Sequence, residues 1–370
     1  MKRIVLTTLA CGLLATSLTA CSSTKDDIVQ ESEEKKEETV YIPELQLDNN
    51  FYRVLLPYKP SEARGIIVHN VHTKYDMKEV EEGLLRISTQ YFSPDKYYFQ
   101  DGQYLNKETI YSWLNRSSKD KAGLNPPLDK GKKDEEVPSY LAHIQEQNYL
   151  TKNGDKAVAL SGISIGLALN SIYYSSEGKE IEIPDSKLKE EGMKIANEVV
   201  RRMREEMEVP DVPIAVGLFK QQPRNAIVPG TYFLTGLADK GKTEVTGWKG
   251  IDEEYVLLPA KDDENERYQE LSNLFTKFQN EVDEYFPNYV NVIGYGHYQD
   301  GGISSINVEI PIQFFGTSEL IGFTQHVTTL VMKYFSTMDI EVSVTSVNGP
   351  EALILKKEND EEPFVHIYNY

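Results

Sequence analysis

The segment DKAVALSGISIGLALNSIYY, residues 155–174, sets the architecture expected of this chain because residue size alternates along it. The odd positions between Ile163 and Leu169 are large and apolar, and the even positions between Gly162 and Ala168 are small. A period of two with one bulky face predicts a β-strand, or a hairpin, with its larger side chains on one side.

A long amphipathic helix is expected after this strand. It opens at Pro184, carries apolar residues at helical spacing, and ends at Pro210. Two further strands are predicted over residues 213–219 and 226–234. The order strand, helix, strand, strand recurs in the last third of the chain, over residues 303–315, 317–338, 340–347 and 352–357. We therefore expect a divergent structural repeat.

Short turns between strands, with a long helix behind each sheet, indicate an α+β fold. Its sheets are expected to be mainly antiparallel, each backed by long amphipathic helices. We expect the folded part to consist of an N-terminal α+β region at residues 41–150 and two strand-helix-strand-strand units at residues 151–260 and 261–370.

The N-terminal region is expected to mix short strands with helices. Strands are predicted over residues 51–56 and 65–68, and helices over residues 107–114 and 139–147. A further helix is expected to begin with Asp76 as its capping residue, because Glu79 follows in the capping-box position.

The leader MKRIVLTTLACGLLATSLTAC has the pattern of a secretory signal peptide, expected to comprise residues 1–20. Two basic residues precede an apolar run that is too short to span a hydrocarbon core of about 30 Å. The run ends in Leu18, Thr19, Ala20 and Cys21, which resemble a bacterial lipobox. Cleavage is then expected between Ala20 and Cys21, and the Cys21 thiol is expected to carry a diacylglycerol. The alternative is an ordinary signal peptide with a chance cysteine.

Residues 21–40 are polar and highly charged, so we expect a disordered acidic tether, with a solvated helix as the alternative. The whole chain has 58 acidic and 39 basic residues and a formal charge of −19. This charge argues against binding to nucleic acid and to anionic lipid, so attachment to the membrane is expected through acyl chains. With Cys11 removed in the leader and Cys21 acylated, the mature chain would contain no disulfide.

Two short motifs match enzyme signatures. Residues 236–243 fit the phosphate-binding pattern G-x-x-x-x-G-K-[ST], but the residues that follow have no helical period, and such a loop needs a helix. Residues 162–166 fit G-x-S-x-G, and Asp283 and His297 follow in the order of some serine hydrolases. Because the alternation runs straight through Ser164, a strand is preferred to a nucleophile elbow. A hydrolase that uses Ser164 is kept as a less favoured alternative.

No catalytic, metal or cofactor site is predicted. His69 and His72 have the spacing of a helical metal pair but no third ligand nearby, and His326 is expected to be partly buried and hydrogen-bonded. Tyr and Phe cluster within residues 91–104 and 285–298. These clusters indicate either core packing or, on a surface between the two repeat units, recognition of a peptide or glycan of the cell envelope.

Several stretches carry a family resemblance: the lipobox, the acidic tether, FYRVLLPYKPS at residues 51–61, ARG at residues 63–65 and FSPDKYYFQDGQYL at residues 92–105. With them the chain resembles the CamS family of sex-pheromone lipoproteins of Gram-positive bacteria. The resemblance continues through GTYF at residues 230–233 and the last helix, and it covers essentially residues 50–357.

The resemblance implies a precursor with two products. Signal peptidase would release the leader, and trimming would yield a short apolar conjugation pheromone from its end. Here that peptide would span residues 13–20 or 14–20, within Leu13, Leu14, Ala15, Thr16, Ser17, Leu18, Thr19 and Ala20. Its three hydroxyl residues depart from the aliphatic pattern of the family.

The mature product would be a palmitate-bearing lipoprotein on the extracellular face of the cell membrane. Lipoprotein-modifying enzymes would attach its acyl chains at Cys21. The folded domain would be non-enzymatic, and its role and any envelope ligand are left open.

Overall fold

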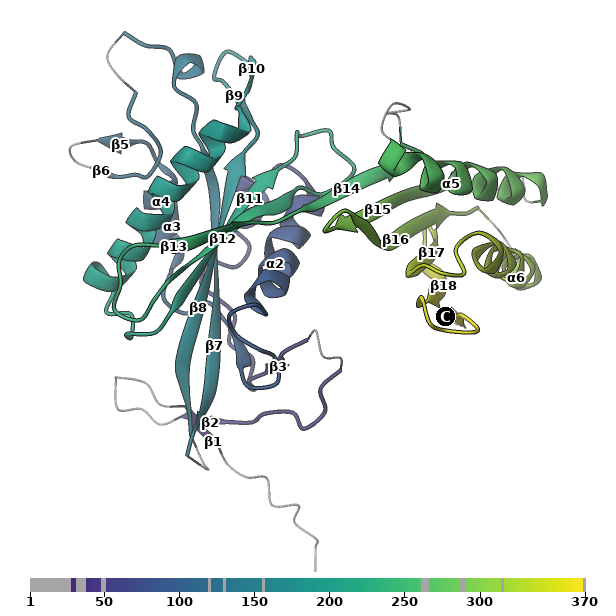
Figure 1. The fold of residues 1–370 in the computed structure, drawn as a ribbon, viewed down its shortest axis with the longest axis horizontal. Helices are drawn as coiled ribbons and strands as arrows, with labels where there is room; N and C mark the ends of the chain where they lie inside the picture. The colour runs from purple at the N-terminus through teal and green to yellow at the C-terminus, as the bar shows by residue number, and fades with distance from the viewer. Residues whose placement is uncertain are drawn as a thin grey trace, which may run out of the picture.

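The computed structural model describes residues 28–30, 38–47, 51–118, 121–128, 131–154, 157–260, 266–285, 291–313 and 316–368. The signal peptide, the lipobox, Cys21 and the candidate peptide at residues 13–20 lie outside these residues. The described chain forms two domains (Figure 1), one on a sheet whose last strand ends at Gly250 and one on a sheet that starts at Glu253. None of the described helices is long and apolar enough to cross a membrane.

The first domain is built on a nine-stranded sheet. Seven of its strands follow the order β13-β12-β11-β8-β7-β4-β3; of the other two, β1 pairs with one end of β8, and β2 pairs with β1. Its strands are β1 (Ile28–Gln30), β2 (Glu38–Val40), β3 (Arg53–Val54), β4 (Tyr98–Asp101), β7 (Leu141–Asn153), β8 (Ala157–Asn170), β11 (Ile214–Gln221), β12 (Thr231–Ala238) and β13 (Thr246–Gly250). Strand β8 contains the alternating segment and confirms the strand predicted there. Two small hairpins, β5 (Ser117–Ser118) with β6 (Lys121–Ala122) and β9 (Ile172–Tyr174) with β10 (Glu180–Glu182), and a 3-10 turn, η1 (Asp134–Glu136), complete this domain.

Helices cover both faces of the first sheet. The large residues of β8, such as Ile163 and Leu167, are fully buried against α4 (Asp185–Glu206), beside α3 (Lys107–Leu114). Helix α2 (Lys74–Ser88) packs on the opposite face, next to the short α1 (Ile67–Asn70). The small residues of β8 make room there, because a Cβ added at Gly166 would lie 2.4 Å from the Tyr232 hydroxyl.

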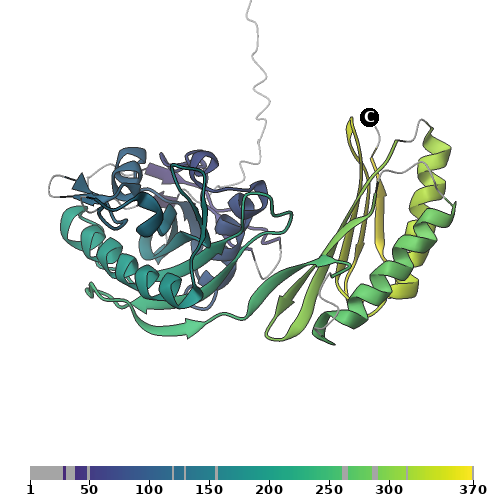
Figure 2. The ribbon, with the colours of Figure 1, turned by 90° about the horizontal axis from the view of Figure 1, so that it is seen from above.

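The second domain is built on a six-stranded sheet backed by two helices on one face only (Figure 2). Its strands follow in spatial order: β14 (Glu253–Leu258), β15 (Ile293–Gln299), β16 (Gly302–Pro311), β17 (Ile340–Ser346), β18 (Gly349–Lys356) and β19 (Phe364–Ile367). Helices α5 (Glu266–Tyr285) and α6 (Thr317–Tyr334) bury Phe275, Phe278 and Phe323 against the sheet. The other face of the sheet carries no described helix and turns toward the first domain.

The expected repeat is present, and it is longer than the sequence suggested. The first domain contains β4-α3-β7-β8-α4-β11-β12-β13, and the second contains β14-α5-β15-β16-α6-β17-β18-β19. In both, the two central strands pair in parallel across the second helix, β8 with β11 and β16 with β17, and the flanking strands pair antiparallel. The α+β class with mainly antiparallel sheets is therefore confirmed.

We expected a boundary at residue 150, between an N-terminal region at residues 41–150 and a repeat unit at residues 151–260, but the first sheet runs across it. Strands β7 and β8 form one long antiparallel hairpin across residue 150, so both stretches share the first sheet. Within the expected tether, β1 pairs with β2 and with β8. These short segments hold the apolar residues Ile28, Val29 and Val40 within an otherwise polar stretch, and they pair with a neighbouring strand.

Two local predictions were wrong. Residues 139–147 were predicted to be helical, but most of them belong to β7, which is covered on both faces and so lacks a period of two. Residues 65–68 were predicted to form a strand, but Ile67 and Val68 belong to α1. The helix predicted over residues 107–114 is confirmed as α3.

Candidate functional site

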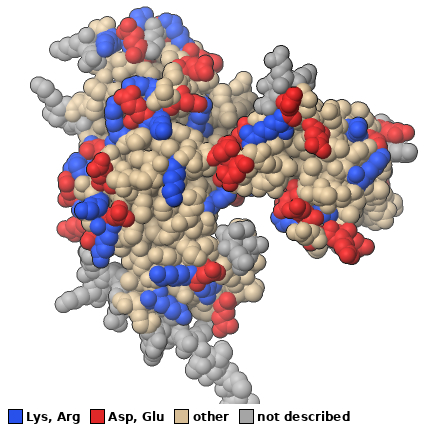
Figure 3. Space-filling model, viewed as in Figure 1, with Lys and Arg blue, Asp and Glu red and all other residues tan. Residues whose placement is uncertain are grey.

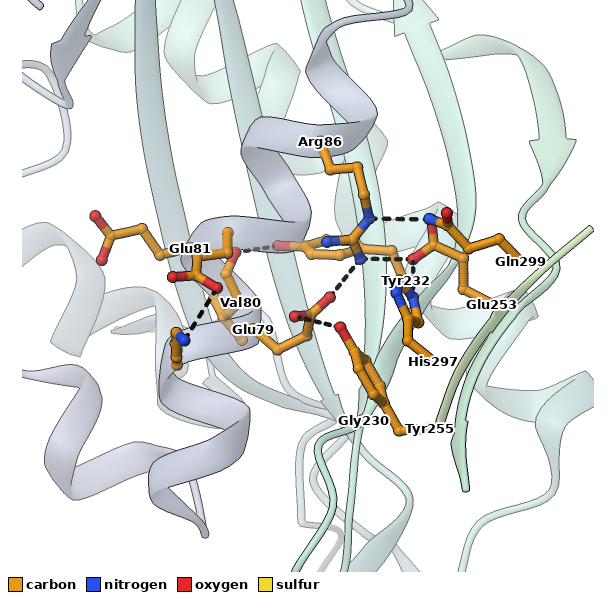
Figure 4. A network of polar contacts seen from close by, with 12 residues as sticks. Glu79, Val80, Glu81, Arg86, Gly230, Tyr232, Glu253, Tyr255, His297 and Gln299 are labelled. Carbon is orange, nitrogen blue, oxygen red and sulfur yellow. Dashed lines mark hydrogen bonds and ion pairs between the residues drawn. The ribbon is translucent and has the colours of Figure 1, made fainter. Parts of the chain in front are cut away.

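The two domains meet at a buried cluster of charged groups on α2 and β14 (Figure 4). Arg86 of α2 donates to both oxygens of Glu253, with Nη2 to Oε2 at 2.6 Å and Nε to Oε1 at 3.2 Å. The same guanidinium pairs with Glu79, which lies about two turns before Arg86 on α2. Tyr255 donates its hydroxyl to Glu79 at 2.9 Å, and Gln299 donates its amide to Glu253 at 3.1 Å. We call these residues the junction cluster.

Arg86 contacts both carboxylates of the junction cluster, and the pKa values of these two carboxylates shift in opposite directions. Burial acts to raise the pKa of Glu253, but the neighbouring His297 and the Arg86 guanidinium outweigh it and lower that pKa to about 2. Burial raises the pKa of Glu79, against the opposing effect of Arg86. The side chains of Glu79 and Glu253 are 6% and 8% exposed. Removing Arg86 would leave each of these buried carboxylates without its cation, which would destabilise the protein.

His297 lies at the edge of this cluster. Its ring stacks on Tyr255, with centroids 4.3 Å apart and planes within 9°. The Nε2 atom is 3.8 Å from Glu253, too far for a hydrogen bond, and has no hydrogen-bond partner in the described structure.

A cleft of about 140 Å³ opens beside the junction cluster, between α2 and the helix-free face of the second sheet. Tyr75, Lys78 and Glu82 line it from α2, and Tyr295 and Asn307 line it from β15 and β16. Figure 3 shows a hollow between the domains, with acidic and basic side chains interspersed on that face.

This cleft combines aromatic rings with hydroxyl, amide and carboxylate groups. Such a set suits recognition of a polar ligand by stacking and hydrogen bonding. In the part of the chain that the structure describes, no group of three His, Cys, Asp or Glu side chains is placed to hold a metal ion.

Ser164, the candidate hydrolase nucleophile, lies in the middle of β8. It is fully buried, and its hydroxyl accepts a hydrogen bond from Ser88 at 2.7 Å. The strand continues to Asn170, so the sharp turn of a nucleophile elbow is absent here. His297 lies at the edge of the junction cluster, and Asp283 is exposed on α5. The structure does not bring Ser164, Asp283 and His297 together, so the less favoured hydrolase alternative gains no support from it.

The phosphate-loop pattern at residues 236–243 falls on a hairpin. Strand β12 ends at Ala238, Gly241 turns the chain with φ +73°, and β13 follows. The helix that would present its N-terminus to a phosphate is replaced by this strand.

The two tyrosine-rich segments divide between core and surface. In the first, Phe92 and Phe99 pack around Tyr149 in the first domain. In the second, Tyr298 is buried in the core, whereas Tyr295 lines the cleft.

Among the histidines, His69 lies on α1, whereas His72 packs edge-on against Tyr174, and His326 contacts the backbone oxygen of Glu281 as expected of a hydrogen-bonded residue.

Sequence reasoning missed the roles of Asp76 and Glu79, which it assigned to a helix cap. The cap is Thr73, whose side chain accepts from the Asp76 backbone. The Asp76 carboxylate instead accepts from the backbone N–H of Gly230 at 2.6 Å and of Gln222 at 3.0 Å. Burial raises its pKa to about 6, against these two hydrogen bonds. The partners are distant along the chain, so no local pattern could have indicated them.

Comparison with known proteins identifies relatives over most of the chain. The family model described as CamS sex pheromone cAM373 precursor matches residues 58–362. A crystal structure of a sex pheromone precursor from Lactobacillus salivarius subsp. salivarius UCC118 is similar at TM-score 0.81 and 30% identity, covering 90% of this chain and 99% of that chain. The C-terminal domain of the sex pheromone staph-cAM373 precursor from Staphylococcus aureus is similar at TM-score 0.69 and 32% identity, covering 81% of this chain and 99% of that chain. No curated protein matches the chain significantly.

Proposed function

The chain belongs to the CamS sex pheromone cAM373 precursor family, and we propose that it is the precursor of a lipoprotein held on the extracellular face of the cell membrane through acylated Cys21. The observation that carries this proposal is the family match over residues 58–362, preceded by a leader that ends in Leu18-Thr19-Ala20-Cys21. Signal peptidase and the lipoprotein-modifying enzymes are its expected partners during maturation.

The anchor is tested by replacing Cys21 with Ser and following the protein through membrane fractionation. The variant should move from the membrane fraction to the medium or the leader should remain uncleaved, because no thiol remains to accept the diacylglycerol. Cys11→Ser is the matched control, since Cys11 leaves with the leader and its loss should not change the fractionation. A Cys21→Ser variant whose leader is cleaved and which still associates with the membrane as the wild type does would contradict the proposal.

We further propose that the cleaved leader releases a peptide ending at Ala20 and beginning at Leu13 or Leu14. Its Thr16, Ser17 and Thr19 weaken apolar binding, since each buried CH₂ contributes about 0.8 kcal/mol. The experiment is mass spectrometry of culture medium, followed by a conjugation assay with the synthetic peptide. A variant peptide with Val at these three positions should be more active than the native one. The absence of any peptide ending at Ala20 would contradict release.

The folded part is proposed to be non-enzymatic and to bind a ligand of the cell envelope. The observation that favours binding is the cleft beside the junction cluster, which is lined by Tyr75 and Glu82 from the first domain and by Tyr295 and Asn307 from the second. Rings and polar groups together suit a glycan or an extended peptide.

Tyr295→Ala tests this role in a retention assay on cell-wall fractions. Retention should weaken about tenfold, because loss of a central aromatic contact costs more than about 1.4 kcal/mol. Tyr111→Ala is the control, since Tyr111 is a surface tyrosine on α3, far from the cleft lining. Equal retention of both variants would remove the cleft from consideration.

A further inference from the structure

A second cavity, of about 230 Å³, lies in the first domain where β4 ends and leaves the edge of β7 uncovered. Its walls come from the loop before α1, from α2, from α3 and from β7, and it shares no lining residue with the cleft between the domains. Ile67, Met77 and Ile110 give it apolar sides. Since a water molecule takes up about 30 Å³ in the liquid, the cavity has room for several waters or one small organic molecule.

His143 of β7 lines this cavity and carries a polar atom that the protein leaves without a hydrogen-bond partner. The residue is 2% exposed, and its Nδ1 has no hydrogen-bond partner in the described structure. Burial lowers the pKa of this imidazole to about 4, so the ring is neutral near pH 7 and offers a lone pair. A buried polar atom without a partner costs about 1–3 kcal/mol, which a bound donor would relieve.

The carboxylates around the cavity differ in how well the protein satisfies them. Glu146 is fully engaged, because it accepts from three successive backbone N–H groups at residues 103–105. Asp101 is also engaged, by Tyr58, by the Ser61 backbone at 2.8 Å and by Arg64 at 3.9 Å.

Glu81 differs from both. It is an exposed residue of the cavity lining, and its carboxylate forms no ion pair within the described residues, although the Arg64 guanidinium acts against the burial that raises its pKa.

The charges and shape of the cavity favour a cation. Three carboxylates line it against the single guanidinium of Arg64, which already contacts Asp101 and Tyr58. An anion would be repelled, and a neutral molecule would leave Glu81 unpaired. The apolar walls suit an alkyl stem, and a neutral imidazole accepts a hydrogen bond.

We propose that this cavity binds a primary ammonium group on a short alkyl chain, with N–H donors directed at Glu81 and His143 and the stem against Met77 and Ile110. Two sources share this chemistry, a free alkylamine and the side chain of a lysine in a peptide.

The test is a titration of the full mature chain, followed by NMR of the His143 ring. The probes are n-butylammonium, N-acetyl-lysine N-methylamide, and n-butanol as the neutral match. If only butylammonium binds, the natural ligand is a free alkylamine. If the lysine derivative binds, the natural ligand is a lysine side chain of a peptide. Both results support the proposal if the His143 signals shift. Equal binding of butanol, no binding of either cation, or an unchanged His143 ring would overturn it.

Glu81→Gln keeps the shape of the mouth and removes its charge. The bound cation should be held about fivefold more weakly, which corresponds to about 1 kcal/mol for one partly exposed charge pair. Glu108→Gln, at an exposed position on α3, should leave the affinity unchanged. Glu81 is on the surface, so folding is preserved, and a matching melting temperature checks this. An affinity unchanged by Glu81→Gln would also overturn the proposal.

Discussion

The two domains share one order of strands and helices, yet they treat the second face of the sheet differently. In the first domain, Gly166 and Gly217 leave space on that face, and Tyr232 and α2 fill it. In the second domain, the corresponding strands present Asn307 and Ser343 on the face opposite the core, and no described helix covers them. Small residues therefore admit a third layer, and polar residues keep the face open for the cleft.

Helix α2 takes part both in the third layer of the first domain and in the contact between the domains. Its apolar side packs on the first sheet through Val80, Leu84 and Ile87, and its polar side supplies Glu79 and Arg86 to the junction cluster. The third layer of one domain is thus also the contact surface of the other.

The largest difference between the two faces is expected from truncating one large side chain on each. Tyr232→Ala should lower the free energy of unfolding of the first domain by about 3–5 kcal/mol, because the ring is fully buried and its hydroxyl donates to Val80 at 2.7 Å. Leu353→Ala, on the uncovered face of β18, should cost about 1 kcal/mol. Urea unfolding followed by circular dichroism measures both, and similar losses would mean that the two faces are equally covered.

A smaller effect is expected at the contact between the domains. Arg86→Ala leaves Glu79 and Glu253 without their shared cation and should cost about 2–3 kcal/mol, less than a fully buried pair because Arg86 is 31% exposed. It should also widen the distribution of distances between the domains in small-angle X-ray scattering.

Arg267→Ala is the matched control for Arg86→Ala. Arg267 pairs with Glu254 at 2.7 Å, and both residues belong to the second domain. This variant should lose stability without changing the scattering profile. If both variants scatter like the wild type, the junction cluster does not fix the orientation of the domains.

The last effect concerns pH and is confined to the first domain. Burial raises the pKa of Asp76 from 3.8 to about 6, so folding favours its protonated form. Its contribution to stability is present below about pH 4 and is lost as the pH rises through about 6. Asp76→Asn should therefore remove a downward slope in the free energy of unfolding between about pH 4 and 6. Urea unfolding across that range measures the slope, with the exposed Glu180→Gln as a control that keeps it.

Local periodicity explains which parts of the fold were predictable. The apolar stripes of α4 and α6 are visible in the sequence because each helix buries one face, and the alternation in β8 is visible because one buried face is bulky and the other is built of small residues. From them the repeat followed. Strand β7 is covered on both faces, so its pattern lacks a period and was mistaken for a helix.

The junction cluster was not predictable for a different reason. Arg86 and Glu253 are separated by 167 residues, and Glu79 and Tyr255 by 176. Their pairing depends on how α2 and β14 meet in space. Only Tyr295, within a tyrosine-rich segment, gave a signal that the cleft would be lined by aromatic rings.

The proposal that Cys21 anchors the chain is best examined by mass spectrometry of the mature N-terminus. Trypsin should release residues 21–25, CSSTK, as the first peptide of the membrane-bound protein. This peptide should begin at Cys21 and carry the mass of a diacylglycerol thioether. An unmodified CSSTK peptide, or a mature chain that begins at another residue, would contradict it.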